Sequence, residues 1–282
     1  MGRVVLFLFA AFCMFPMVFL LSGRTACAED PVHVEQSPEN PCVGLLADLD
    51  RPTISDSACV APLGHAVLEL GFQHADVRGP GGGTAKNYPQ AELRFGIPGR
   101  NEIKVLAPNY TNQRSGIPEE ASSGLSATSI GFKHELGYNS HWIGSVETIL
   151  TLPSGNAAFG SRGLGAAFIG IVNYAVNDHV AVALELGVNS QTTSKLAGGE
   201  RFTGFISNFV ATWQPMDKFQ FYGEVFGQSK TGPGESAGYN FDGGVQYLLT
   251  RWWEVDLEEG VWLTGNLGGF THYYGAGMGF LF

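Results

Sequence analysis

Charged residues are scarce in this chain: Asp, Glu, Lys and Arg make up 15% of its 282 residues, where a soluble domain usually carries about 25%. After residue 30 there is no apolar run of the roughly 20 residues that a membrane-spanning helix needs. A mean hydropathy of +0.05 is also too polar for a bundle of such helices. Basic residues are few, with 16 Lys and Arg against 26 Asp and Glu. The basic face that binds nucleic acid is therefore absent, and we expect no nucleic-acid partner.

Glycine and phenylalanine take the place of the missing charges, with 39 and 20 residues. A transmembrane β-barrel has this kind of composition, because its strands alternate lipid-facing and lumen-facing side chains. A soluble β-sandwich or a lipocalin-like barrel is the alternative all-β fold.

The N-terminus is typical of a targeting segment. A positive charge precedes the apolar run 4–21, and Ala26-Cys27-Ala28 is a small-residue cleavage site. We expect residues 1–28 to be a cleaved signal peptide, after which 14 basic and 26 acidic residues leave a net charge of −12. An uncleaved anchor helix and acylation of Cys27 are the alternatives, although Arg24 fits a lipoprotein motif poorly.

Cysteine is also rare, with four residues, of which Cys13 and Cys27 leave with the signal peptide. Cys42 and Cys59 remain, and in an oxidising periplasm such a pair is expected to form a disulfide. The segment 29–63 around them is polar and rich in proline and aspartate. We expect it to be a periplasmic leader that can reach into the mouth of the barrel.

From Gly64 onward the apolar residues recur at every second position, as in half-buried strands. Leu68, Leu70 and Phe72, for example, alternate with Glu69 and Gly71. Twelve such segments are predicted, at about 64–76, 88–97, 102–110, 125–136, 142–152, 163–174, 179–190, 202–214, 218–228, 238–249, 252–263 and 272–282. The segment 163–174 is apolar on both faces, so its orientation stays open.

The connections between these segments alternate in length. Short turns are predicted at 98–101, 137–141, 175–178, 215–217 and 250–251, and long loops at 77–87, 111–124, 153–162, 191–201, 229–237 and 264–271. This alternation predicts a closed antiparallel up-and-down barrel of about 12 strands over residues 64–282, with both ends in the periplasm. An aromatic girdle is expected at the periplasmic rim, from Trp142, Tyr174, Trp213, Tyr247, Trp252, Trp253 and Phe282.

The last predicted strand places Tyr274, Met278, Phe280 and Phe282 on one face. An amphipathic strand that ends on phenylalanine resembles the C-terminal signal of bacterial outer-membrane barrels. We therefore expect the bacterial outer membrane as the location, with its lipids and the barrel-insertion machinery as partners.

Several short motifs over residues 50–282 resemble the outer-membrane transporter family associated with the MetA pathway of phenol degradation. They are Asp50-Arg51-Pro52, Gly124-Leu125 with Gly131-Phe132-Lys133, Leu152-Pro153-Ser154-Gly155, Gly223-Glu224-Val225-Phe226-Gly227, Asp242-Gly243-Gly244 and Val255-Asp256-Leu257. The chain departs from the family at Thr53, Ala127 and the cysteine-containing leader. The resemblance implies passage of small solutes, including hydrophobic or aromatic compounds.

The inward faces of the predicted strands collect charged side chains that share one lumen. The candidate lumen and solute-contacting residues are Glu69, Glu92, Arg94, Lys104, Lys133, Glu147, Glu185, Glu224, Asp242, Asp256 and Glu258, and Glu102 lies on the same faces. They can form a constriction that screens solutes by size and charge, or they can pair with one another to fill the lumen. Acids outnumber bases in this set, which predicts a mild preference for cations in an open pore. Glu259 falls on the lipid face without an explanation.

No catalytic, metal or cofactor site is predicted. His134 and His272 are candidate lipid-side histidines, but neither has the nearby serine of a barrel lipid hydrolase, and the histidines lack metal-ligand spacing. The first hypothesis is therefore a monomeric outer-membrane channel for small solutes rather than an enzyme. The second is a closed structural or surface-binding barrel without transport, and the third is an outer-membrane lipid hydrolase.

Overall fold

Almost all of the described chain is strand. The computed structural model describes residues 40–79, 82–115 and 122–282. Within these ranges one short helix, α1 (Leu45–Asp48), precedes a single sheet of 15 strands, and a 3-10 turn (Leu267–Gly269) precedes the last of them. The strands are β1 (Ala66–Val77), β2 (Gly83–Tyr88), β3 (Glu92–Ile97), β4 (Asn101–Leu106), β5 (Tyr110–Ser115), β6 (Ser122–Leu125), β7 (Ser129–Tyr138), β8 (Trp142–Thr151), β9 (Gly165–Asn177), β10 (Val180–Thr192), β11 (Arg201–Met216), β12 (Phe219–Gln228), β13 (Gly238–Thr250), β14 (Trp253–Thr264) and β15 (Phe270–Leu281). No helix in the described ranges is both long and apolar enough to cross a membrane.

Three of the wall strands are each interrupted once. Residues 89–91 separate β2 from β3, 107–109 separate β4 from β5, and 126–128 separate β6 from β7. Pro89 and Pro108 lie in two of these interruptions, where their missing N–H groups cannot join the ladder. Backbone hydrogen bonds still join neighbouring strands across the breaks, at Gln90 N to Gly71 O (2.8 Å) and Ala107 N to Ala91 O (2.8 Å). Counting each interrupted pair once gives the predicted 12 strands.

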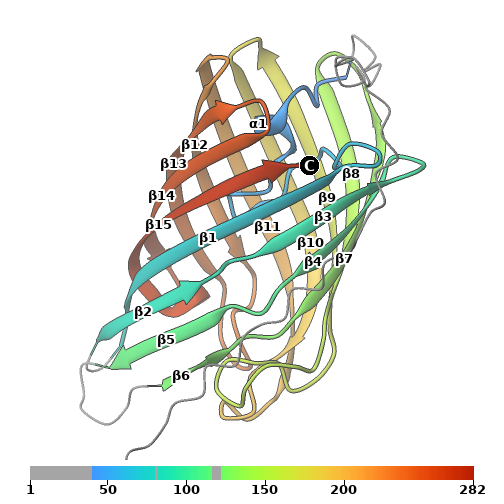
Figure 1. Cartoon of the computed structure of the whole chain (residues 1–282). Coiled ribbons are helices and arrows are strands. Elements are labelled where there is room, and N and C mark those ends of the chain that lie inside the picture. The colour runs from blue at the N-terminus through green and yellow to red at the C-terminus, as the bar shows by residue number, and fades with distance from the viewer. Residues whose placement is uncertain (1–39, 80–81, 116–121) are drawn as a thin grey trace, which may run out of the picture. The chain divides into compact units, whose positions relative to one another are not determined.

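The barrel is closed by its first and last strands. β1 pairs antiparallel with β15 from Val67 opposite Leu281 to Val77 opposite Phe270. Phe282 extends this ladder, because its N–H donates to Ala66 O at 2.9 Å. The closed antiparallel barrel (Figure 1) confirms the predicted fold class.

Short turns and long loops lie at opposite ends of this barrel, here called the short-turn end and the long-loop end. The long loops predicted at 77–87 and 111–124 were wrong in length. The strands β2, β5 and β6 occupy much of those two segments. These strands carry polar residues on their outward positions, such as Lys86 and Arg114. Backbone hydrogen bonds hold a strand in a sheet whether or not it has an apolar face. Apolar alternation therefore did not predict β2, β5 and β6.

The outer surface is apolar, as the alternation predicted. Exposed side chains include Phe132, Phe168, Leu184, Phe209 and Leu257. Near the short-turn end, Trp142 lies opposite Tyr174, and the ring centroids of Trp253 and Phe280 are 5.5 Å apart. β9, which the sequence could not orient, turns Phe168 outward and Ile169 inward.

Candidate functional site

The lumen of the barrel contains residues 40–63, which we call the plug. Within the plug Leu45, Asp50 and Ala58 are no more than 5% exposed, and its atoms bond to strands on opposite sides of the barrel. Figure 1 shows this segment, with α1, inside the ring of strands. The leader expected in the periplasm therefore lies in the barrel along this stretch.

One wall of the lumen is cationic and binds the plug through Asp50. Arg94, Lys104 and Lys133 come from the adjacent strands β3, β4 and β7. The Asp50 carboxylate lies 3.3 Å from Arg94 Nε, 3.2 Å from Lys104 Nζ and 3.1 Å from Lys133 Nζ. Burial alone would raise the pKa of Asp50, but these three cations hold it well below its usual range. Asp50 therefore stays ionised at the centre of the site.

The same cations also pair with acids of the wall. Arg94 lies 3.1 Å from Glu69 and 2.9 Å from Glu102, while Lys104 Nζ lies 2.7 Å from Glu147 and 3.3 Å from Glu92. A buried charge is costly unless it is paired and hydrogen-bonded. This wall of the lumen is thus a paired network and not a row of free charges.

Four wall glutamates hold the plug by its backbone. Glu224 accepts from the N–H groups of Ile54 (2.8 Å) and Ser55 (2.9 Å). Glu69, Glu102 and Glu185 bind further plug amides in the same way, at Asp50 and Arg51, at Ala61 and at Asp56. Because a folded segment without a ladder leaves backbone donors unpaired, these carboxylates replace the missing partners.

The opposite wall, formed by β12–β15, is acidic. Arg51 reaches across to it, with Nη2 3.1 Å from Asp256 and 3.6 Å from Glu258. Burial opposes the charge of Arg51, yet these acids raise its pKa above the ordinary value. Farther along the wall, Tyr273 donates to Asp242 at 2.5 Å.

Glycines on β15 make room for the acids of β14. Glu254, Asp256 and Glu258 lie directly opposite Gly279, Gly277 and Gly275 in the ladder. A Cβ placed on each of these glycines would meet its acid partner, most closely at Gly275 against Glu258. The alternation of glycine in the last strand therefore fits the acid row on its neighbour.

All eleven candidate lumen residues lie on the inside of the barrel. Ten are at most 5% exposed, and the Glu92 side chain is 15% exposed. Five further lumen residues carry no signal of that role in the alternating pattern: Asp48, Asp50, Arg51, Glu254 and Tyr273. The Asp50-Arg51-Pro52 motif was the available signal for two of them.

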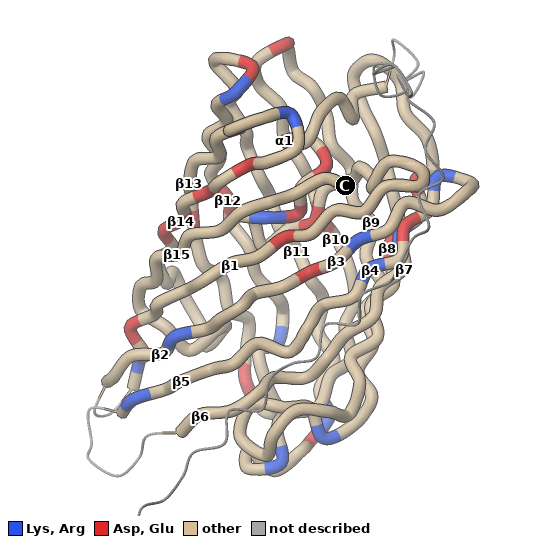
Figure 2. The backbone as a smooth tube through the Cα atoms, in the orientation of Figure 1, with Lys and Arg blue, Asp and Glu red and all other residues tan. Residues whose placement is uncertain are grey.

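The third side of the lumen is apolar. β9 carries no charged residue, and its inward Ile169 and Ile171 pack with Ile143 of β8 against Cys59 and Ala58 of the plug. Ile149, Ala167 and Ile206 extend the same surface, which we call the apolar stripe. Figure 2 shows few charged positions along β9 and β10 and many on β3, β4 and β7.

A cavity of about 520 Å³ lies beside the stripe at the short-turn end, between the plug and strands β8–β13. Its mouth includes the turn residues His141 and His179. The wall residues that line it are uncharged, among them Ile143, Ala183 and Thr212. The charged residues that line it are Arg51 and Asp56 of the plug and Asp178 of a turn, and none comes from the strands.

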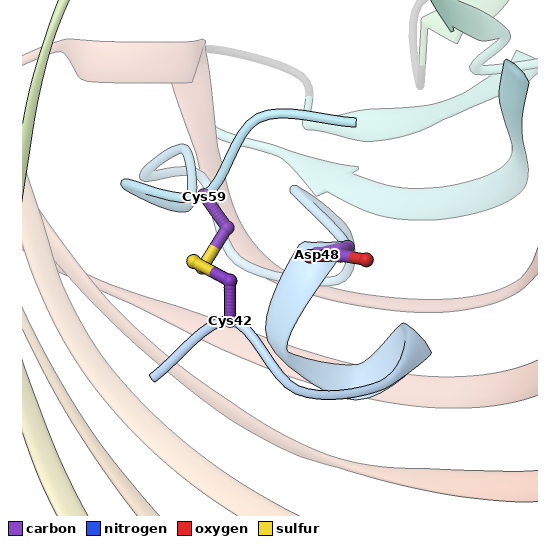
Figure 3. Close-up of side chains that lie close together, drawn as sticks. All are labelled: Cys42, Asp48 and Cys59. Atoms are coloured by element: carbon purple, nitrogen blue, oxygen red, sulfur yellow. A yellow bond between two sulfur atoms is a disulfide. The ribbon is translucent and has the colours of Figure 1, made fainter. Parts of the chain in front are cut away.

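Cys42 and Cys59 form a disulfide, with Cα atoms 5.7 Å apart. The Asp48 carboxylate lies within 4.8 Å of both sulfurs (Figure 3). Burial raises the pKa of Asp48 to about 8 despite the nearby charge of Arg94. A bonded cystine offers no thiolate to a metal, so this group of three is not arranged as a metal centre.

The two candidate histidines have other partners. His134 Nδ1 lies 2.7 Å from Asn101 Oδ1. His272 Nε2 lies 2.8 Å from Glu259, which explains the acid that the sequence left unassigned. The Glu259 side chain is 71% exposed on the outer surface.

Comparisons with known proteins establish the fold. No protein-family model and no curated protein matches the chain. Among solved structures, an outer membrane channel from Pseudomonas putida F1 is similar with a TM-score of 0.64 and 11% identity, over 80% of this chain and 98% of that one. The NanC porin (TM-score 0.51, 8% identity) and the KdgM porin (0.50, 11%) are similar over 76% and 75% of this chain and 98% of theirs. The chain thus has the fold of bacterial outer-membrane channels and porins.

Proposed function

We propose that the protein is an outer-membrane channel for small uncharged solutes with apolar character, including aromatic compounds. One observation carries the proposal: among the described residues, the apolar stripe is the only side of the lumen that the plug does not bind through ions, and the strand residues of the cavity beside it are uncharged. Solutes would move along β8–β11, between the stripe and the plug. The charged side chains on the other walls would bind the plug and would not contact the solute.

We propose cleavage of residues 1–28, a short-turn end in the periplasm, and Tyr274, Met278, Phe280 and Phe282 as an insertion signal. Membership of the phenol-degradation transporter family is part of the same proposal. It is supported by Asp50 and Arg51, since the motif behind the resemblance supplies both charged centres of the plug.

The test is solute block of ion current in planar bilayers. The purified channel is expected to conduct ions weakly, and a neutral aromatic alcohol should reduce that current by occupying the stripe. Replacing Ile169 and Ile171 by serine should weaken the block about tenfold, the effect of losing roughly 1.4 kcal/mol of apolar burial. The matched control is Phe168→Ser with Val172→Ser, two residues of the same strand that face outward.

A second function, a closed barrel without transport, is favoured by the occupied lumen and its paired charges. Its outer loops would then carry the activity. Absence of both conductance and solute uptake in folded, heat-modifiable protein would contradict the channel and support this second function.

A further inference from the structure

The Cys42–Cys59 disulfide closes the plug into a ring. The two cysteines are 17 positions apart in sequence, and α1 lies between them. The ring is folded on itself, since Ser57 N donates to Asp50 Oδ1 at 2.7 Å and Ser57 Oγ to Ala47 O at 2.7 Å. These bonds make the ring a compact folded unit.

Nearly every polar anchor of the plug belongs to this ring. Asp50 binds the cationic wall, Arg51 binds the acidic wall, and Ile54, Ser55 and Asp56 bind Glu224 and Glu185. These contacts reach in different directions and can form together only while the ring keeps its shape. Opening the ring frees the backbone of this segment in the released state, which makes release more favourable.

The cystine itself stands on the proposed solute route. Cys42 and Cys59 pack against Ile143, Ile169 and Ile171 of the apolar stripe. Cys59 also lines the cavity that opens at the short-turn end. A small reagent that enters this cavity therefore comes next to Cys59, one half of the disulfide.

We propose that the Cys42–Cys59 disulfide is a redox lock on the plug, which a small dithiol entering from the short-turn end opens to clear the apolar stripe. This inference rests on the proposed channel function. It adds to that function a regulator and the chemical class of the molecule that operates it.

The exchange balances without any group beyond the dithiol. A thiolate of the reductant attacks one sulfur of the cystine, breaks the S–S bond and forms a mixed disulfide, while the other cysteine leaves as a thiolate. The second thiol of the reductant then attacks the mixed disulfide and becomes its own cyclic disulfide. Two electrons and two protons pass to Cys42 and Cys59. Asp48, held within 4.8 Å of both sulfurs, is placed to give a proton to the leaving thiolate.

The test compares oxidised and reduced forms of the full-length protein in planar bilayers. Dithiothreitol is added at the short-turn end, and alkylation followed by mass measurement counts the two released thiols. We expect the open fraction to rise roughly tenfold on reduction and to fall again on reoxidation. The variant C42S/C59S should be open from the start and should not respond to dithiothreitol, which controls for effects of the reagent elsewhere.

Protease protection of the plug is measured on the same samples, with heat-modifiability as the check that the barrel is folded. Reduced protein with two free thiols, an unchanged current and an unchanged protection of residues 40–63 would overturn the lock. Loss of protection without any current would support the lock but refute the channel. The two proposals can therefore fail separately.

Discussion

Asp50 is the residue on which the plug depends most. Its single carboxylate faces Arg94, Lys104 and Lys133, and none of these cations reaches bulk water. It also accepts from Ser57 within the plug. One side chain thus joins three wall strands to the ring that fills the lumen.

The variant Asp50→Asn is expected to lower the free energy of unfolding by about 3–5 kcal/mol, because it leaves buried cations short of a partner. The midpoint of guanidinium unfolding in detergent measures the loss. Asp178→Asn, in an exposed turn, should leave the midpoint unchanged. The folded pKa of Asp50 is lowered, so its contribution is present above the ordinary value of 3.8 and is lost as the pH falls through the lowered value.

Asp48 should produce the opposite pH dependence. Its pKa rises from 3.8 to about 8 on folding, so its contribution is fully present below pH 3.8 and is lost as the pH rises through about 8. Asp48→Asn should remove this loss. Guanidinium midpoints at pH 4, 6 and 8 test it: the difference between variant and wild type should grow steadily with pH, and a constant difference would contradict the assignment.

At the scale of elements, the last two strands are matched to each other. Glycines at alternate positions of β15 face the acids of β14 across the ladder. Glycine normally weakens a strand, because it loses more backbone freedom and packs no side chain. Here that cost is offset by the space it leaves for carboxylates that must stay inside the barrel.

Gly277→Ala tests this match. A Cβ there would lie 2.5 Å from Arg51 Nε and 2.6 Å from Asp256 Oδ2, so the pair that anchors the plug must shift. We expect a loss of about 1–3 kcal/mol in stability and greater protease access to the plug. Gly170→Ala on β9 is the control, since its nearest neighbour, Leu186 O, is 3.8 Å away. Equal effects of both variants would show that the loss is a general cost of changing a strand glycine.

The sequence predicted those elements in which one face is apolar and the other polar. In β1, for instance, Leu68 and Leu70 alternate with Glu69, so both the strand and its inward residue were identified. The alternation could not orient β9, where Phe168 and Ile169 are both apolar. Glu254 was missed because it directly follows Trp252-Trp253, which were assigned to the rim.

The position of the plug could not be predicted from the sequence, for a different reason. Residues 40–63 have no periodicity, and their partners are far away in sequence, as with Arg51 and Asp256 at a separation of 205. A composition rich in proline and aspartate indicates an irregular segment but does not place it. The disulfide could be predicted because it needs only two cysteines and an oxidising compartment, whereas its place on the apolar stripe depends on the closed barrel.

At the scale of the whole molecule, the lumen is divided by charge. A cationic wall paired with acids, an acidic wall and an uncharged stripe surround one plug. On the acidic β12–β15 wall, Arg51 is the only cation among the described residues that pairs with Asp256 and Glu258. The native channel should therefore select only weakly between ions as long as Arg51 stays in place.

Arg51→Gln should make the channel selective for cations. Without the guanidinium, which lines the cavity, the charges of Asp256 and Glu258 beside it are left uncompensated, and carboxylates near a pore favour K⁺ over Cl⁻. The reversal potential across a KCl gradient measures the change and should move toward the K⁺ equilibrium value. Arg100→Gln is the matched control, because Arg100 pairs with Glu135 at 3.2 Å and its side chain is 56% exposed, away from the acid row. A reversal potential that stays the same in Arg51→Gln, while the conductance persists, would mean that ions pass along the stripe without meeting the acidic wall.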